Sequence, residues 1–331
     1  MNVLSSKLLS KLQDYLNSTD FRETIGYVKA LNLKFYERQG LSNAIYLLKI
    51  ETDNGFIKEF ILKVYQHDGK KALKEHRILS VLYKKGVPVP KVYAFNRSGD
   101  VLGKPFTIME KIQQVSTVNE YVLIDAAAES LTKIHSVAPS EVGDIIKAKR
   151  NYPLCDLKEI KALAFISMLT TLGKPAVFTE LFNRARKLEG TRAVAELKLT
   201  HGDYSLDNIL YSNGKAYVID WESADAAEPT FDVAYTFNIL DFNDEISGRT
   251  GQKLSETFIE SYEKFGGVLT DFQFYRRMAA LKLLTILEAA SRPGLIASIF
   301  GNLEKRTKSK DAKLFLESFR KYLRRILSGE E

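Results

Sequence analysis

The chain has 331 residues, of which 45% are apolar and 27% charged, and its single cysteine is Cys155. This composition is typical of a globular protein and excludes a disordered or fibrous chain. One cysteine excludes an intramolecular disulfide framework and favours a reducing compartment. The N-terminus lacks the apolar core of a signal peptide, and no apolar run reaches the roughly 18 residues of a membrane span. We therefore expect a cytoplasmic protein without membrane segments.

The net charge of +7 is unevenly distributed along the chain. Residues 220–263 contain eleven acidic and two basic side chains, whereas residues 304–325 contain nine basic and three acidic ones. Apolar positions in the basic segment follow helical spacing, which favours a packed helix with a solvated basic face over a nucleic-acid site. No nucleic-acid or membrane partner is expected, and the oligomeric state stays open.

The first third of the chain alternates between strand-like and helical patterns. Asn54-Gly55 separates two strand-like runs and is a strong hairpin signal. The expected elements are a helix at 4–16, strands at 31–37, 44–51 and 56–65, a helix at 69–83, and strands at 92–96 and 106–110.

Beyond residue 112 the periodicity becomes mostly helical, with one short hairpin at 209–219. We therefore predict an α+β chain with two lobes. A small N-terminal lobe (1–110) would hold an antiparallel β-sheet and one main helix. A larger C-terminal lobe (111–331) would be mostly α-helical. A hinge at about 109–114 would join them, and ligands commonly bind at such junctions.

The most informative motif runs from His201 to Asn208 and is followed, after the short hairpin, by Asp220. A two-residue turn at Asn213-Gly214 would bring Asn208 beside Asp220, because directly opposed residues lie about 5 Å apart. An amide oxygen and a carboxylate suit a hard cation such as Mg²⁺. Asp203 precedes Asn208 by five positions and completes an arrangement used in phosphoryl transfer. The alternative is that these side chains only cap turns.

Lys63 and Glu75 are charged residues in apolar surroundings. Lys63 interrupts an apolar strand, and Glu75 lies on the apolar stripe of the helix at 69–83. A buried charge without a partner is costly, so the two are expected to pair and to present an ammonium to ATP phosphates. The alternative for Lys63 is an edge-strand lysine that points into solvent.

The turn at 37–44 contains Gly40, Ser42 and Asn43. Glycine allows close backbone approach to phosphates, and the two polar side chains add hydrogen bonds. An ordinary turn is the competing interpretation.

Together these motifs resemble the aminoglycoside phosphotransferase / choline kinase-like family of small-molecule kinases, which has a protein-kinase-like fold. The resemblance extends from about residue 31 to residue 237. Its anchors are Gly40-Leu41-Ser42-Asn43, Lys63, Glu75, residues 86–90, Ile108-Met109-Glu110, the His201–Asn208 motif, residues 219–222 and residues 231–234. The His201–Asn208 stretch also resembles the kinase-like domains attached to acyl-CoA dehydrogenases.

The resemblance implies roles for individual residues. Asp203 would be the catalytic base, Asn208 and Asp220 would bind Mg²⁺, and Lys63 would contact the α- and β-phosphates of ATP. The backbone of Glu110 and Ile112 would hold adenine, and Asp232 would tie down the catalytic loop.

These features predict an ATP- and Mg²⁺-dependent phosphotransferase that acts on the hydroxyl group of a small molecule. Candidate acceptors are aminoglycosides, amino sugars, sugars and amino alcohols. The alternatives are a protein kinase, disfavoured by the twelve positions from Asp220 to Asp232, and a non-catalytic nucleotide-binding module. The acidic excess in 220–263 favours a cationic acceptor. Trp221, Tyr235 and Phe242 would either form an aromatic cage for it or pack in the core.

Overall fold

The chain divides into two compact units in this computed structural model, which describes residues 6–36, 43–66, 69–146, 183, 197–290 and 310–329. The first unit comprises Met1–Ser116 and Leu210–Glu222, and the second comprises Thr117–Ile209 and Ser223–Glu331. The polypeptide thus leaves the first unit, returns to it for one short segment, and ends in the second.

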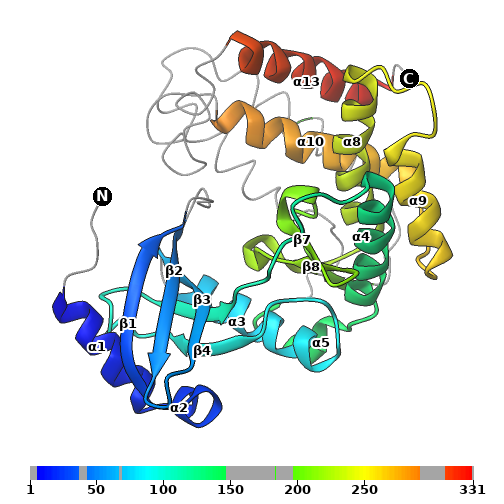
Figure 1. Cartoon of the computed structure of the whole chain (residues 1–331). Coiled ribbons are helices and arrows are strands. Elements are labelled where there is room, and N and C mark those ends of the chain that lie inside the picture. The colour runs from blue at the N-terminus through cyan, green and yellow to red at the C-terminus, as the bar shows by residue number, and fades with distance from the viewer. Residues whose placement is uncertain are drawn as a thin grey trace. The chain divides into compact units, whose positions relative to one another are not determined.

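An antiparallel five-stranded sheet with strand order β1-β2-β3-β5-β4 forms the first unit (Figure 1). Its strands are β1 (Val28–Phe35), β2 (Asn43–Thr52), β3 (Ile57–Tyr65), β4 (Val92–Asn96) and β5 (Phe106–Glu110). The predicted hairpin joins β2 to β3, and its Gly55 has a φ of 78°. Glycine adopts this left-handed conformation without steric cost.

Helices cover both faces of this sheet. They are α1 (Ser6–Asn17), α2 (Asp20–Ile25) and α3 (Gly69–Lys84). Buried side chains of α1 and α2 share one core cluster with Phe60 and Leu62 of β3. Successive residues of a strand point to opposite faces, so Lys63 and Tyr65 lie on the other face, where α3 packs against β3, β4 and β5. This alternation places Lys63 beside a helix rather than in solvent.

The segment that returns to the first unit is mostly a hairpin of β7 (Ile209–Ser212) and β8 (Lys215–Val218). Asn213 and Gly214 form its turn with φ values of 50° and 74°, as a type I′ turn requires. The predicted two-residue turn is confirmed. The Val218 amide donates to the Pro88 carbonyl at 2.9 Å, which ties the hairpin to the rest of the first unit.

The second unit is mainly helical. Its helices within the described ranges are α4 (Glu120–His135), α5 (Pro139–Val142), α8 (Thr230–Ile246), α9 (Leu254–Lys264), α10 (Phe272–Ala290) and α13 (Lys310–Ser328). Two short strands, β6 (Lys198–Thr200) and β9 (Asp225–Ala227), pair antiparallel. The three-residue turns η1 (Leu206–Asn208) and η2 (Trp221–Ser223) precede β7 and β9, respectively. The chain is therefore α+β, as predicted.

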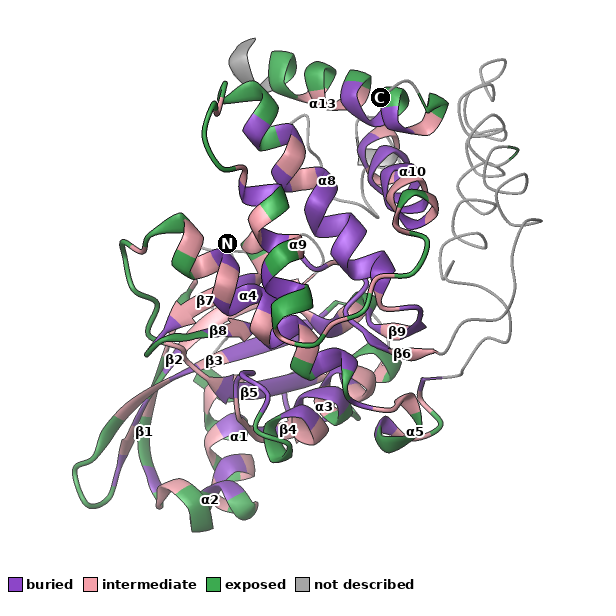
Figure 2. Ribbon diagram, turned by 90° about the vertical axis from the view of Figure 1, so that its right-hand side faces the viewer, coloured by how far each residue is buried: buried purple, intermediate pink, exposed green. Residues whose placement is uncertain are grey.

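Helix α8 lies at the centre of the second unit and is buried along most of its length (Figure 2). Its apolar side chains form a core with those of α10 and α13, with Tyr235, Met278 and Leu323 among the buried members. Three buried polar residues of α8, Asp232, Tyr235 and Thr236, hydrogen-bond residues of the His201–Asn208 motif. None of the described helices is long and apolar enough to cross a membrane.

The elements expected from the sequence in the first third of the chain are present. The sequence patterns did not reveal α2, β6 or β9, which have only six, three and three residues. Such short segments show less than two helical turns or two strand periods, so their pattern carries little signal.

Candidate active site

Lys63 and Glu75 form a buried ion pair on the α3 face of the sheet. The Lys63 Nζ lies 2.8 Å from Glu75 Oε2, and their side chains are 8% and 2% exposed. Glu75 also accepts hydrogen bonds from the Tyr65 hydroxyl at 2.7 Å and the Trp221 amide at 3.3 Å. The predicted pair is present, and the solvent-exposed alternative for Lys63 is wrong.

Two further carboxylates reach the same ammonium. Asp220 Oδ1 lies 3.0 Å and Glu222 Oε1 lies 3.2 Å from Lys63 Nζ. Burial alone would lower the pKa of Lys63, but Glu75, Asp220 and Glu222 raise it well above its ordinary value. Lys63 therefore stays a cation at neutral pH.

Asp220 follows β8 and has a φ of 65°, which is uncommon for a residue other than glycine. Its side chain is 41% exposed, in contrast to that of Glu75. The left-handed backbone turns the chain from the hairpin into η2 and leaves a carboxylate that is both held by Lys63 and open to solvent. Such a carboxylate can bind a cation without complete burial.

Asp203 and Asn208 come together in the second unit. The Asn208 Nδ2 donates to the Asp203 carbonyl at 2.9 Å and to Asp203 Oδ2 at 3.2 Å. The Tyr235 hydroxyl donates to the other carboxylate oxygen, Oδ1, at 2.6 Å. Both oxygens of Asp203 are thus oriented, and the amide nitrogen of Asn208 is used, which leaves the amide oxygen to act as a ligand.

The backbone before Asp203 is held by Asp232, which is 0% exposed. Its carboxylate accepts from the His201 amide at 2.6 Å and from the Gly202 amide at 2.8 Å. Burial would raise the pKa of Asp232, but hydrogen bonding and charge from His135 and His201 lower it below its usual value. Asp232 is therefore an anion that fixes two consecutive amides of the loop.

Of the predicted nucleotide contacts, Gly40 and Ser42 lie outside the described residues. Asn43 begins β2, and its Nδ2 donates to Glu222 Oε1. Glu110 ends β5, and its amide donates to the Lys91 carbonyl at 2.8 Å. Ile112 is half-buried in the irregular segment that follows. The roles of these residues in nucleotide binding stay predictions.

Asn208 belongs to the second unit and Asp220 to the first, so their shared Mg²⁺ also stays a prediction. Within the described ranges, no group of three or more His, Cys, Asp or Glu side chains is arranged to hold a metal. The predicted pair contributes one carboxylate and one amide oxygen. This donor set fits Mg²⁺, which commonly uses few protein ligands together with substrate phosphates.

Sequence reasoning did not assign Glu222 or His135 to the site, and it considered Tyr235 only for an aromatic cage and not as a partner of Asp203. Glu222 belonged to the Asp220 motif, and its charge two positions after Asp220 was the available signal. Tyr235 and His135 gave no such signal, because a tyrosine and a histidine on apolar helix faces usually pack in the core. His135 Nε2 lies 3.2 Å from Asp232 Oδ2, and its Nδ1 lies 2.8 Å from the Tyr262 hydroxyl.

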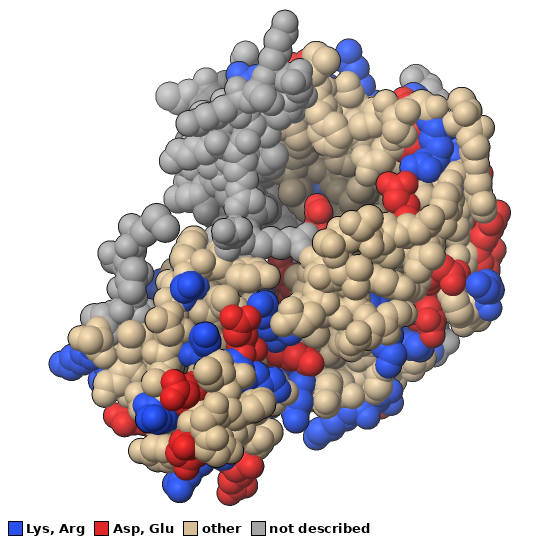
Figure 3. Space-filling view, viewed as in Figure 1, with Lys and Arg blue, Asp and Glu red and all other residues tan. Residues whose placement is uncertain are grey.

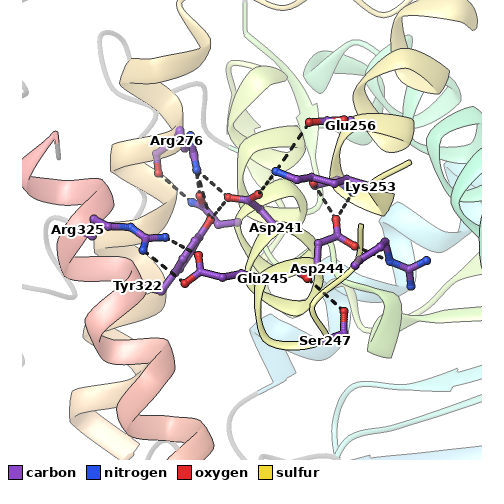
Figure 4. A network of polar contacts seen from close by, with 12 residues as sticks. Asp241, Asp244, Glu245, Ser247, Lys253, Glu256, Arg276, Tyr322 and Arg325 are labelled. Carbon is purple, nitrogen blue, oxygen red and sulfur yellow. Dashed lines mark hydrogen bonds and ion pairs between the residues drawn. The ribbon is translucent and has the colours of Figure 1, made fainter. Parts of the chain in front are cut away.

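The acidic side chains of α8 have partners within the second unit (Figure 4). Asp241 pairs with Arg276 at 2.8 Å and accepts from the Tyr322 hydroxyl at 2.8 Å. Asp244 pairs with Arg249 at 2.9 Å, and Glu245 pairs with Arg325. Figure 3 likewise shows acidic and basic side chains interspersed on the face it draws. These three carboxylates are thus already paired within the second unit and give no independent support to a cationic acceptor.

The aromatic residues considered for a cage are buried. Trp221 is 0%, Tyr235 4% and Phe242 2% exposed. Tyr235 and Phe242 belong to the core of α8, α10 and α13, and Trp221 donates to the Val218 carbonyl. All three side chains therefore pack in the core, which was the alternative to an aromatic cage.

A model of the Phosphotransferase enzyme family matches residues 38–281, which is most of the chain. The chain belongs to this family. Every residue predicted for the site, from Gly40 to Asp220, lies inside the segment that the family model matches.

A curated relative of this phosphotransferase-family chain is acyl-CoA dehydrogenase family member 10 from Mus musculus. The two are 24% identical over 260 residues, which cover 67% of this chain and 23% of the relative. The chain therefore spans about a quarter of that relative's length.

Solved structures share the fold of this chain. A candidate aminoglycoside phosphotransferase from Ralstonia eutropha JMP134 superposes with a TM-score of 0.66 and 18% identity, covering 96% of this chain and 98% of its own. An amicoumacin kinase in complex with AMP-PNP, Ca²⁺ and Ami superposes with a TM-score of 0.57 and 15% identity. The match covers 97% of this chain and 96% of that kinase. The fold is therefore protein-kinase-like, and family and neighbours together support a kinase-type enzyme.

Proposed function

We propose that this protein transfers the γ-phosphate of ATP, with Mg²⁺, to a hydroxyl group of a small molecule. The observation that carries the proposal is the oriented carboxylate of Asp203, held by Asn208 and Tyr235 in a loop whose backbone Asp232 anchors. A carboxylate fixed at both oxygens, yet not paired with a described cation, is suited to accept a proton from a nucleophile.

In the proposed reaction the acceptor hydroxyl gives its proton to Asp203 while its oxygen attacks the γ-phosphorus. The bond from that phosphorus to the β,γ-bridging oxygen breaks, and ADP leaves with the bonding electrons. Asp203 later releases the proton to solvent. Phosphoryl transfer needs little covalent help from the protein, so positioning of the acceptor and charge neutralisation supply most of the rate.

Lys63 would bind the α- and β-phosphates, with Glu75 holding its ammonium in place. Asn208 Oδ1 and the Asp220 carboxylate would hold Mg²⁺, which supplies charge neutralisation at the phosphates when bound. Gly40, Ser42 and Asn43 would contact the phosphates. The Glu110 amide already donates to Lys91, so a contact from Glu110 to adenine would use its carbonyl, and Ile112 would supply the next backbone contact.

A small-molecule acceptor is supported by the short distance in sequence from Asp220 to Asp232. The described residues between them form η2, β9 and the start of α8, which leaves no long segment for a peptide platform. The acceptor would be an aminoglycoside, amino sugar, sugar or amino alcohol. A cytoplasmic location, where ATP is abundant, is part of the proposal.

The test is a screen of these acceptor classes for ADP release from Mg·ATP, with Asp220→Ala as the matched variant. We expect one class to stimulate ADP release and the variant to lose Mg²⁺-dependent ATP binding without loss of fold. Phosphate entering generic proteins instead would indicate a protein kinase. ATP binding without turnover on any acceptor would indicate a nucleotide-binding module.

A further inference from the structure

The second unit contains a buried lysine that the proposed chemistry does not use. Lys282 of α10 is 7% exposed, and its Nζ donates to the Gly202 carbonyl at 2.7 Å. The ammonium also lies 5.7 Å from the Phe231 ring centroid and 6.0 Å from that of Tyr235. Burying an ammonium is costly, so a lysine kept in this core calls for a function beyond packing.

The Gly202 carbonyl belongs to the peptide that carries Asp203. Lys282 holds the oxygen of this peptide. The N–H of the same peptide, which belongs to Asp203, donates to His201 Nδ1 at 3.3 Å. The position before Asp203 requires glycine, because its φ is 78° and a Cβ there would collide with the Ser223 carbonyl oxygen. Lys282 thereby sets the plane from which the Asp203 side chain projects.

Helix α8 supports the same loop from its own side. Asp232, Tyr235 and Thr236 occupy one helix face, at spacings of three and four residues. They bind, respectively, the amides before Asp203, the Asp203 carboxylate, and the Tyr204 carbonyl at 2.6 Å. Tyr235 is 4% exposed and packed in the core, so its hydroxyl is a rigid donor to Asp203 Oδ1.

We propose that Lys282 and Tyr235 are positioning residues that orient Asp203 for proton acceptance, Lys282 through the preceding peptide and Tyr235 through the carboxylate. The proposal rests on the proposed function of Asp203. Lys282 acts through the peptide before Asp203, and Tyr235 acts through Asp203 Oδ1, so both act on the proposed proton acceptor. Their removal should therefore slow the chemical step and leave nucleotide binding intact.

The test compares Lys282→Met, Lys282→Arg and Tyr235→Phe with the parent, and uses Lys321→Met, an exposed lysine of α13, as the control. The probe is turnover of Mg·ATP, with water as acceptor and with any acceptor found by the screen. Misplacement of a catalytic group by about 1 Å can cost roughly 100-fold in rate. We expect kcat to fall about 10- to 100-fold in Lys282→Met and Tyr235→Phe.

Three accompanying measurements separate positioning from a merely structural role. ATP Kd and Tm should stay close to parental values, Lys282→Arg should recover part of kcat, and Lys321→Met should match the parent throughout. Parental kcat in both Lys282→Met and Tyr235→Phe would overturn the proposal. A parallel loss of kcat, ATP affinity and Tm would also overturn it. Should Lys282→Met not fold, Tyr235→Phe, which keeps the ring, carries the same comparison.

Amide hydrogen exchange at Gly202 and Asp203 distinguishes this inference from the proposed function. It needs neither nucleotide nor turnover. If the parent neither binds nor hydrolyses ATP, the proposed function fails, and faster exchange at these amides in Lys282→Met than in Lys282→Arg would still show that Lys282 positions the loop. Unchanged exchange in Lys282→Met would overturn the positioning role.

Discussion

The side chains around Lys63 in the first unit differ in charge from those around Asp203 in the second. Around Lys63, three carboxylates converge on one buried ammonium, and the contacts are ionic. Around Asp203, one carboxylate is held by an amide and a phenol, which are neutral donors. The first arrangement satisfies a buried charge, whereas the second orients the carboxylate that we propose as the proton acceptor.

This difference predicts which substitutions should change the free energy of unfolding and which should change only the rate of the reaction. Removing a partner of a buried ion leaves an uncompensated charge, so substitutions around Lys63 are expected to lower the free energy of unfolding. Asp203 is half-buried and its partners are neutral, so its substitution should mainly alter chemistry.

Asp203→Asn should give the largest effect of the four substitutions, and this effect should be confined to kcat. The change keeps size and shape but removes the proton acceptor, and a positioned base contributes about 10²- to 10⁴-fold. We expect kcat to fall by that factor, with ATP Kd and Tm unchanged. Steady-state kinetics, calorimetric titration and thermal unfolding on one preparation would check it. A joint loss of Tm and ATP affinity would instead make Asp203 a structural anchor of its loop.

Glu75→Gln should lower stability as well as activity. The substitution removes the main anionic partner of Lys63, and breaking a buried pair costs on the order of 3 kcal/mol. Urea unfolding would measure the change, and ATP affinity should fall in the same variant. A variant as stable and active as the parent would mean that Asp220 and Glu222 suffice to hold Lys63.

Tyr65→Phe tests how far Glu75 depends on its neutral donor. The hydroxyl donates to Glu75 Oε2 at 2.7 Å inside the core, and loss of a hydrogen bond to a charged group costs about 1.5–3 kcal/mol. We expect a loss near the lower end of that range, because Lys63 and the Trp221 amide still bind Glu75. The same urea unfolding assay applies, and an effect equal to that of Glu75→Gln would contradict this ranking.

Glu129→Gln should have the smallest effect and serves as the surface counterpart of Glu75→Gln. Glu129 pairs with Lys133 at 2.7 Å on α4, but their side chains are 42% and 44% exposed. Exposed pairs at this helical spacing contribute about 0.3–0.5 kcal/mol. Unfolding in urea at low and high salt should show a small difference that salt removes. A loss comparable to that of Glu75→Gln would argue that ion-pair burial does not decide stability here.

Several features of the fold and the site were predictable from local sequence. The Asn213-Gly214 turn follows from residues that accept positive φ, and strand β3 follows from its apolar run. The Lys63–Glu75 pair was predictable for a different reason. A buried charge without a partner is unfavourable. Since Lys63 and Glu75 carry opposite charges in apolar elements, the sequence alone indicates that they pair.

Other features depended on contacts between segments that are distant along the chain. Nothing near Tyr235 in the sequence indicates that its hydroxyl meets Asp203, 32 positions away, or that Lys282 meets Gly202, 80 positions away. The same holds for the carboxylates of α8, which belong to the acidic segment 220–263 that favoured a cationic acceptor in the sequence. Composition records how many charges a segment carries. Only the tertiary structure decides which of them are already paired, because pairing depends on how helices pack and not on their order in the chain.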